Sequence, residues 1–331
     1  MGIQRTLLGG ATALSAALLF FAPVHAQEVE LVHASLNPET HIDYPVNMDF
    51  VNRVEKLSDG RIKFRVFDSG VLGDERQMIE QMQSGTIATA RLTPAALSGL
   101  CSGISILNLP FLFADGQALL DAVNSPEFKE ICDETLMANG IHPLSYWWMG
   151  VRDLYTKSPV ENLDEVKGMK LRVWEDRYVV QAWEALGAIP TPISFSELYT
   201  SLQTGAVDGA EGWAASYNSQ SFYEVAPHLT RISYIQIAST LAISEAVWQK
   251  LPADLQAVVQ QAADENAAFA FETFSAVQDG IYERSANVAT VHEVSDIDTW
   301  VTRSSVVFDS FANDQPEAVA RMLAKLRANS N

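Results

Sequence analysis

The sequence is poor in positive charge, and this shortage excludes a class of partners. Its 22 lysines and arginines stand against 41 aspartates and glutamates, which gives a formal net charge of −19. Such a surface repels nucleic acids and anionic membranes. Salt screens surface charges over about 8 Å, whereas a buried arginine acts at contact distance. The composition therefore argues against nucleic-acid partners and leaves an anionic small ligand open.

Cysteine and metal-binding patterns are also scarce. The chain has two cysteines, Cys101 and Cys132, and six histidines without H-x-x-x-H spacing. In an exported protein the cysteine pair is a candidate disulfide, which would close a loop of about thirty residues and add a few kcal/mol of stability. Two free buried thiols are the alternative. No metal site and no cofactor are predicted.

Long hydrophobic runs are missing after the first 26 residues. Residues 1–26 contain Arg5, an apolar run over 7–22 and a small-x-small ending at 24–26, which together predict a secretory signal cleaved after Ala26. No later run reaches the ~18 apolar residues of a membrane span. No cysteine follows the cleavage site to carry a lipid. We therefore expect an exported protein of the periplasm.

Catalytic motifs are few. The sequence has no G-x-G-x-x-G opening a helix, no Walker loop and no G-x-S-x-G. "GLCSG" (99–103) places Cys101 between glycines, as in the nucleophile turn of a hydrolase, but such a turn needs a following helix. The next segment, "ISILNLPF" (104–111), is predicted to be extended. The chain is thus predicted not to be an enzyme, with an exported hydrolase using Cys101 as the minor alternative.

Strand and helix patterns alternate from residue 28 onward. Strands are predicted at 28–35, 61–67 and 88–92, and helices at 44–58 and 74–85. This βαβαβ order predicts a mainly parallel sheet with helices on its faces.

The alternation recurs in the second half of the chain. Strands are predicted at 142–150, 169–174 and 206–212, helices at 177–187 and 194–205, a strand between lobes at 232–244, and a long helix from Pro252 to about Gly280. A single hydrophobic core stops growing at roughly 250–300 residues, so this chain is expected to form two α/β lobes.

Five segments, in order, resemble one protein family. They are "GRIKFRVFDSGVLGDERQMIEQMQSG", "LNLPFLFAD", "VKGMKLRVWED", "LGAIPTPISFSELYTSLQTGAVDGAEG" and "FYEVAPHLT". They are similar to motifs of the DctP-type solute-binding proteins of tripartite ATP-independent periplasmic (TRAP) transporters. The resemblance covers most of residues 30–275. It implies a protein that captures an organic acid and passes it to the sodium-coupled membrane permease.

The resemblance also implies the two-lobed periplasmic binding protein fold. Each lobe would be a mainly parallel sheet flanked by helices, with strands crossing between the lobes. We expect lobe I to comprise residues 27–149 with 238–277, and lobe II residues 150–237 with 278–331. A monomer is expected.

By this resemblance Arg172, in the strand "MKLRVW", matches the carboxylate-binding arginine of the family. A planar guanidinium offers two parallel N–H donors to a carboxylate. The carboxyl end of a parallel strand also faces the crevice in which α/β folds bind ligands. The alternative is a surface arginine paired with Glu175 or Asp176.

Other ligand-binding positions follow from the same resemblance. Arg152 matches a second pocket arginine, Phe195 an aromatic that packs on the ligand, and Thr93 and Arg91 match pocket positions in the first lobe. An ion pair within one lobe is the alternative for Arg152. Packing in the core or beside the sheet is the alternative for the others.

One departure from the family pattern concerns the ligand. The family usually has Asn after V-D-G-x-E, whereas this chain has Gly212 followed by Trp213. The missing amide leaves room for a larger ligand, and Trp213, Trp174 and Trp148 of "YWW" would supply flat apolar walls. An aromatic or bulky apolar monocarboxylate is therefore the expected ligand.

Two other ligands stay open. A dicarboxylate would be held between Arg91 and Arg172. A 2-oxo acid would be bridged by a cation at Glu211, as in some relatives.

Overall fold

The sheet at the centre of the molecule has nine strands in the part of the chain that the computed structural model describes, residues 1–2 and 28–329. They are β1 (Val29–Ala34), β2 (Ile62–Phe67), β3 (Thr89–Leu92), β4 (Ile141–Thr156), β5 (Lys170–Val173), β6 (Ile189–Pro192), β7 (Gly209–Trp213), β8 (His228–Ser244) and β9 (Thr290–Glu293). Their order is β2-β1-β3-β8-β4-β7-β5-β6, and β9 pairs with β8. The predicted signal cleavage after Ala26 lies outside the described residues.

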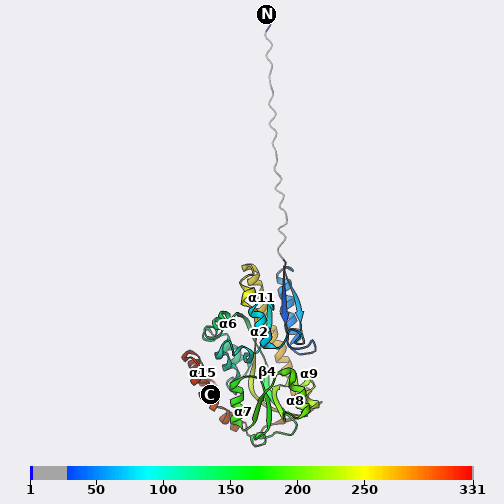
Figure 1. Ribbon diagram of the computed structural model, residues 1–331, viewed down its shortest axis with the longest axis vertical. Coiled ribbons are helices and arrows are strands. Elements are labelled where there is room, and N and C mark those ends of the chain that lie inside the picture. Colours follow the sequence, from blue (N-terminus) through cyan, green and yellow to red (C-terminus); the bar gives the residue numbers. More distant parts are fainter. Residues whose placement is uncertain (3–27, 330–331) are drawn as a thin grey trace.

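The two ends of this sheet are parallel and its centre is antiparallel. β1 pairs in parallel with β2 and β3, and β5 with β6 and β7. The long strands β4 and β8 pair antiparallel with each other and join the two ends (Figure 1). The predicted two-lobed α/β arrangement is confirmed. The lobes share one sheet because β4 and β8, with 16 and 17 residues, are long enough to serve both.

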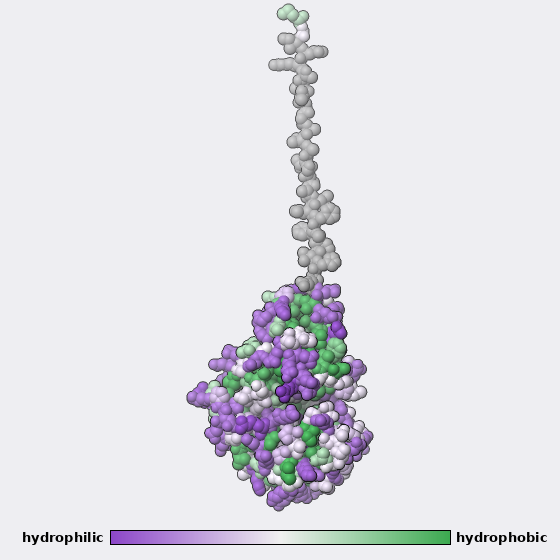
Figure 2. All heavy atoms as spheres, in the orientation of Figure 1, coloured by the Kyte–Doolittle hydropathy of each residue, from purple (hydrophilic) through white to green (hydrophobic). Residues whose placement is uncertain are grey.

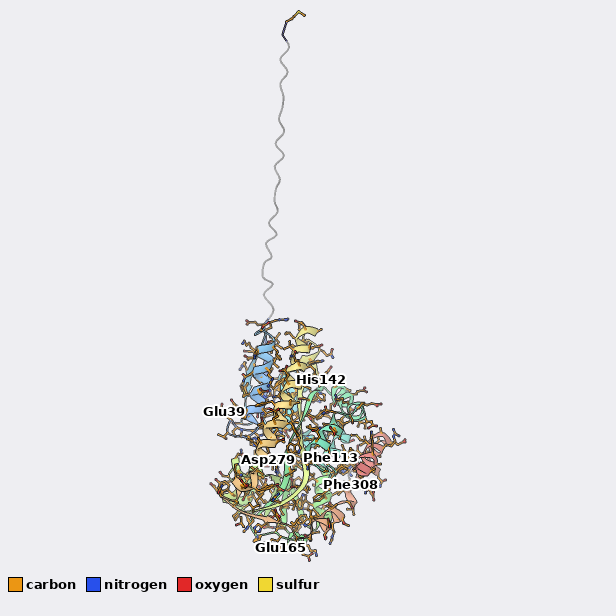
Figure 3. All side chains as sticks on the ribbon, turned by 180° about the vertical axis from the view of Figure 1, so that it is seen from behind. Glu39, Phe113, His142, Glu165, Asp279 and Phe308 are labelled. Atoms are coloured by element: carbon orange, nitrogen blue, oxygen red, sulfur yellow. The ribbon has the colours of Figure 1, made fainter. Side chains whose placement is uncertain are left out.

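Lobe I, the upper part of Figure 1, is covered by amphipathic helices. They include α1 (Tyr44–Leu57), α2 (Glu75–Gln83), α6 (Glu134–Ala138) and α11 (Ala253–Gln278). Figure 3 shows α1 and α11 side by side. In α1 the buried residues Val46, Phe50 and Val54 are four apart and form one face toward the core. The long helix predicted from Pro252 is confirmed as α11.

Lobe II is covered by a second set of helices. They are α7 (Arg177–Leu186), α8 (Leu198–Thr204), α9 (Ala214–Ser219), α12 (Ile281–Ser285), α13 (Ile297–Ser304) and α14 (Val306–Asp314). The core between α7 and the sheet contains Trp183, edge-to-face with Tyr234 and with Trp300 of α13. Figure 2 shows hydrophilic and apolar side chains interspersed over the outer face of both lobes.

A buried carboxylate connects the start of α7 to lobe I. Asp176 caps α7 by accepting hydrogen bonds from the backbone N–H groups of Tyr178 and Val179, at 2.8 and 3.2 Å. Its other oxygen accepts from Ser105 Oγ and Asn108 Nδ2, both at 2.8 Å. The carboxylate thus satisfies a helix N-terminus and two side chains of the other lobe at once.

The segment after Cys101 differs from its prediction. Residues Ser102–Asn108 form a 3₁₀-helix and are not extended. All but the first of them are buried, and no strand pairs with them, so their backbone groups are satisfied by local turns.

Cys101 and Cys132 are brought together but are free thiols in the structure. Their sulfurs are 3.2 Å apart, and both side chains are buried. The predicted disulfide is therefore not formed here, although the chain places its two sulfurs in contact. Oxidation of this pair to a disulfide stays a prediction.

The last helix returns toward lobe I. In α15 (Glu317–Asn329), Lys325 forms an ion pair of 2.7 Å with Glu127, and Val319 lies close to Gly103. The predicted assignment of residues 278–331 to lobe II thus omits these contacts, and the division of the chain between lobes stays a prediction. Among the described residues, no helix has the length and apolarity of a membrane span.

Candidate functional site

A cleft of about 760 Å³ lies where the carboxyl ends of the parallel strands of both lobes meet. Eight predicted ligand-binding residues line it: Arg91, Thr93, Arg152, Arg172, Trp174, Phe195, Gly212 and Trp213. The other two, Trp148 and Glu211, do not. Strands β3, β4, β5 and β7, and the segments that directly follow β3, β5 and β6, therefore supply these residues.

Arg172 is a buried cation without a counter-ion. It lies on β5 and is 4% exposed. Its Nε donates to the carbonyl of Ile193 at 2.8 Å, and no carboxylate lies within ion-pair distance among the residues that the structure describes. Burial lowers the pKa of Arg172. The alternative of a surface ion pair is wrong, because Asp176 is engaged at the start of α7. The guanidinium is thus free to bind an anion.

Arg152, by contrast, is fully paired. Its Nε donates to Glu211 Oε2, and its guanidinium carbon lies 3.9 Å from the centre of the Trp174 ring. Tyr234 donates its hydroxyl to the same Glu211 oxygen at 2.6 Å, and the backbone N–H of Trp174 donates to the other oxygen at 3.3 Å. Burial opposes the charge of Glu211, but Arg152 outweighs it and lowers the Glu211 pKa. Arg152 therefore forms an ion pair within lobe II, as the alternative held, and also lines the cleft.

Glu211 is not available as a ligand for a bridging cation. Both of its oxygens accept hydrogen bonds within lobe II, and its side chain is completely buried. No group of three or more acidic, histidine or cysteine residues suited to a metal occurs within the described chain. The structure places Glu211 as the counter-ion of Arg152 behind the cleft wall.

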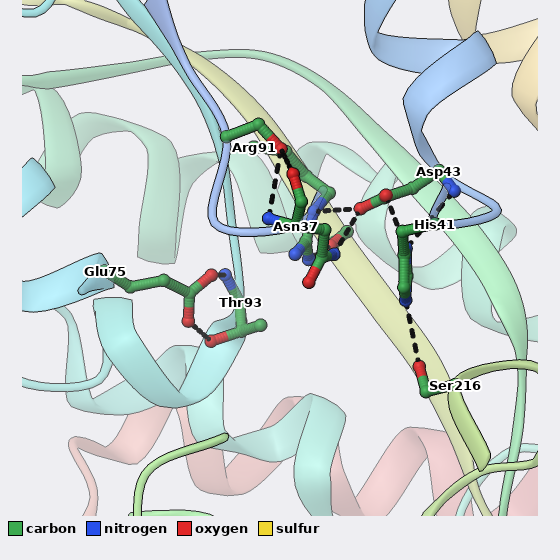
Figure 4. A network of polar contacts seen from close by, with 9 residues as sticks. Asn37, His41, Asp43, Glu75, Arg91, Thr93 and Ser216 are labelled. Atoms are coloured by element: carbon green, nitrogen blue, oxygen red, sulfur yellow. Dashed lines mark hydrogen bonds and ion pairs between the residues drawn. The ribbon is translucent and has the colours of Figure 1, made fainter. Parts of the chain in front are cut away.

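Arg91 belongs to a charge network that crosses the lobes (Figure 4). Its Nε lies 3.2 Å from Asp43, which also contacts His41 Nδ1 at 2.5 Å. Burial raises the pKa of Asp43, but His41 and Arg91 outweigh burial and lower it to about 2. His41 Nε2 then shares a hydrogen bond of 3.1 Å with Ser216 of α9 in lobe II. The charge of Arg91 is therefore already balanced by an ionised carboxylate.

The lobe I wall near α2 is polar. Glu75 accepts hydrogen bonds from Thr93, at 3.0 Å from its backbone N–H and 2.6 Å from its hydroxyl (Figure 4). Burial raises the pKa of Glu75. Asn37, Asp74 and Glu80 line the same side of the cleft. This wall offers many acceptors and few free cationic donors.

Aromatic residues form the opposite wall, with one correction. Trp174, Trp213 and the half-buried Phe195 line the cleft, and all three come from lobe II. Trp148 does not, because its indole donates to Gln236 at 2.8 Å and its ring packs against Gly116 in the core. The prediction that Trp148 of "YWW" forms a flat wall of the cleft is therefore wrong.

Gly212 does not leave room for a larger ligand. A Cβ at this position would lie 2.5 Å from the hydroxyl of Tyr155 and 2.9 Å from its ring. The space is thus already filled by Tyr155 from the neighbouring strand β4. Gly212 is required because that ring approaches the β7 backbone so closely.

Sequence reasoning missed Tyr155, His41 and Ser216, which also line the cleft. Tyr155 is three residues after Arg152, so a regular strand would place the two on opposite faces. The pairing of β4 with β7 runs without a break from Arg152 to Thr156, and the register shift between Arg152 and Leu154 concerns only the pairing with β8. Both residues line the cleft nonetheless. The signal for His41 was its i, i+2 spacing from Asp43, directly after β1. No local pattern pointed to Ser216.

Residues 33–314 match the family model for bacterial extracellular solute-binding proteins, family 7, also called DctP. The chain belongs to the DctP family. A solute-binding protein from Sulfitobacter sp. is 33% identical over 310 residues, covering 92% of this chain and 93% of its own length. DctP proteins serve TRAP transporters, so the resemblance found in the sequence is confirmed.

Two solved DctP structures are informative because of their bound ligands. A TRAP periplasmic solute-binding protein from Sulfitobacter sp., with bound α-D-taluronate, has 30% identity and a TM-score of 0.84, and covers 92% of this chain and 99% of its own. Another from Bradyrhizobium sp., in complex with galacturonate, has 27% identity and a TM-score of 0.84, and covers 91% and 100%. These likenesses confirm the fold.

DctP proteins bind solutes and are not enzymes, as predicted for this chain. The alternative of a hydrolase using Cys101 is wrong. Cys101 does not line the cleft, is 4% exposed and contacts Cys132 instead of a base.

Proposed function

We propose that this protein captures a sugar monoacid, most simply a hexuronate, in the periplasm and delivers it to a TRAP membrane permease. The observation that carries the proposal is Arg172, a buried cation of the cleft that has no ion pair with any residue that the structure describes. A buried guanidinium without a partner is costly until an anion pairs with it, so an incoming carboxylate regains the full charge-assisted interaction.

The polar wall of lobe I supports a body rich in hydroxyl groups. Glu75 and Asn37 line the cleft with carboxylate and amide oxygens that can accept further hydrogen bonds from ligand hydroxyls, besides their bonds to Thr93 and Asp43. The same wall disfavours a dicarboxylate, because a second carboxylate would meet Asp74 and Glu75 and would find Arg91 already paired with Asp43.

The relatives support the same class. The Sulfitobacter and Bradyrhizobium proteins hold uronates, which carry one carboxylate and several hydroxyls. The aromatic side chains of lobe II fit this ligand as well, since the C–H faces of a sugar ring are apolar and pack on flat rings.

An aromatic monocarboxylate is the second candidate. The observation in its favour is that three aromatic residues of lobe II, Trp174, Trp213 and Phe195, line the cleft. A cation-bridged 2-oxo acid has no such support, because both oxygens of Glu211 are engaged.

Isothermal titration of residues 27–331 tests the proposal directly. The ligands are D-galacturonate and D-glucuronate, with D-galactose as the neutral control, succinate as a dicarboxylate and phenylpropionate as an aromatic acid. Uronates should bind, and at 100 times the dissociation constant they should add about 2.7 kcal/mol to the free energy of unfolding. D-galactose should not bind, because it leaves Arg172 unpaired.

The matched variant is Arg172→Ala, which should weaken uronate binding by roughly tenfold to a hundredfold, as for a lost hydrogen bond to a charged group. Binding of phenylpropionate in place of uronates would select the aromatic candidate. Binding of D-galactose as tight as that of galacturonate would contradict the role of Arg172.

A further inference from the structure

We infer that the hydroxyl of Tyr155 is a second donor to the ligand carboxylate that Arg172 binds, in the space that a side chain at position 212 would otherwise fill. The inference deepens the proposed function and rests on it. It assigns to this chain a binding residue from strand β4, level with Arg172 of β5 because both pair with Ala210 of the strand between them, β7.

The hydroxyl of Tyr155 has no partner. The residue lines the cleft and is 1% exposed, yet its oxygen makes no hydrogen bond with any residue that the structure describes. The other buried tyrosines of this region do: Tyr217 donates to the carbonyl of Ala226 at 2.8 Å, and Tyr234 donates to Glu211. The oxygen is not one of the fully buried polar atoms that lack a partner, so it keeps accessible surface at the cleft. A ligand atom in the cleft would supply an acceptor for it.

The ring of Tyr155 is held by two aromatic neighbours. It stacks on Phe222, with ring centres 5.7 Å apart and an interplanar angle of 15°, and also contacts Tyr217 at 5.2 Å. The hydroxyl also lies 2.5 Å from where a Cβ at position 212 would stand, so any side chain there would displace it. The donor is therefore fixed before a ligand arrives, which limits the entropy lost on binding.

The charges around Tyr155 favour an anion at this point. Its strongest charged neighbours are Arg172 and Arg152, and Glu211 is neutralised by Arg152. Burial raises the pKa of Tyr155 to about 12 against the effect of both arginines, so the phenol keeps its proton at neutral pH. A protonated phenol and an unpaired guanidinium, both lining one cleft, are complementary to a carboxylate.

The test is titration of D-galacturonate into Tyr155→Phe, which keeps the ring and its stacking and removes only the hydroxyl. The dissociation constant should rise by roughly tenfold to a hundredfold. Tyr217→Phe is the matched control, because it removes a hydroxyl from the same aromatic cluster without touching the cleft. Its dissociation constant should equal that of the wild type.

A double-mutant cycle with Arg172→Lys separates a shared carboxylate from a general loosening of the site. If both side chains hold one carboxylate, the rise in dissociation constant of the double variant should be smaller than the product of the rises in the two single variants. A rise equal to that product would overturn the inference, and so would an unchanged affinity of Tyr155→Phe. If Tyr155→Phe does not fold, Gly212→Ala displaces the same hydroxyl and should weaken binding similarly; unchanged affinity there overturns the inference.

The two proposals fail in different ways. If the wild type binds no acid, the proposed function fails and this inference falls with it. If the wild type binds uronate and Tyr155→Phe binds it equally well, only the role of Tyr155 is refuted.

Discussion

Replacing Arg172 by methionine should make the empty protein more stable while removing its capacity to bind an acid. The reason is the contrast between the two buried arginines of the cleft. Arg172 has no carboxylate within ion-pair distance in the described part of the chain, and burial lowers its pKa. Arg152 is paired with the buried Glu211, which raises the pKa of Arg152. Methionine keeps much of the volume and apolar stem of arginine and removes the charge.

The magnitude follows from two opposing effects. Burying an ion in a protein costs several kcal/mol even after relaxation. Losing the hydrogen bond from Arg172 to the Ile193 carbonyl costs about 1–3 kcal/mol, and part of the burial is offset by attraction to Glu211. We therefore expect Arg172→Met to raise the free energy of unfolding by about 1–3 kcal/mol, which at about 2 °C per kcal/mol raises the melting temperature by a few degrees.

The assay is thermal unfolding with and without saturating D-galacturonate, for the wild type, Arg172→Met and Arg152→Met. Arg152→Met is the control for volume and position. It strands the buried charge of Glu211 and should lower the free energy of unfolding by about 3 kcal/mol, the lower end for a broken buried pair because Arg172 remains nearby. Arg172→Met should show no shift with the uronate.

A fall in the melting temperature of empty Arg172→Met comparable to that of Arg152→Met would refute the reasoning. It would mean that Arg172 has a counter-ion or structural role in the empty protein. A retained uronate-induced shift in Arg172→Met would refute its role as the anchor for the carboxylate.

Three further predictions concern parts of the fold outside the cleft. Asp176→Ala removes the acceptor of four hydrogen bonds that connect α7 to lobe I, and denaturant unfolding should show a loss of about 3 kcal/mol; a loss below 1 kcal/mol would contradict this. Burial lowers the pKa of His33 to about 4 from 6.5, so its contribution to stability is present above pH 6.5 and is lost as the pH falls toward 4. The wild type should therefore lose roughly 3 kcal/mol more than His33→Asn over that range, and parallel pH profiles would exclude it. Non-reducing peptide mapping of the exported protein should recover the Cys101 and Cys132 peptides joined, since their sulfurs are in contact; recovery of both as free thiols would dismiss the disulfide.

Local patterns were sufficient for the secondary structure that positions the site. The alternation over residues 28–92 predicted β1, α1, β2, α2 and β3, because periods of 2 and 3.6 record which side of an element is buried. The exception was Ser102–Asn108, where an apolar run without periodicity was taken as extended and is a buried 3₁₀-helix. A continuous apolar run records burial but not the type of element.

The sequence predicted some properties of the ligand-binding residues correctly and others not. Arg172 could be placed at the cleft from its strand and from the family pattern. Its lack of a counter-ion could not be predicted. Glu211 is engaged by Arg152 and Tyr234, and these three residues come from three different strands, so their pairing is a long-range contact. The role of Gly212 was misjudged for the same reason, since the ring that fills its space comes from β4.

The acidic composition, the alternating α/β elements, the DctP resemblance and an arginine near the end of a strand could all be recognised without a structure. These features depend on residue type and on spacing along the chain. Three features depend on the folded chain: which arginine stays unpaired, that Tyr155 and Arg172 both pair with Ala210 of β7, and that His41 reaches Ser216 across the lobes. Those outcomes depend on contacts between segments far apart in the chain, which no local pattern records.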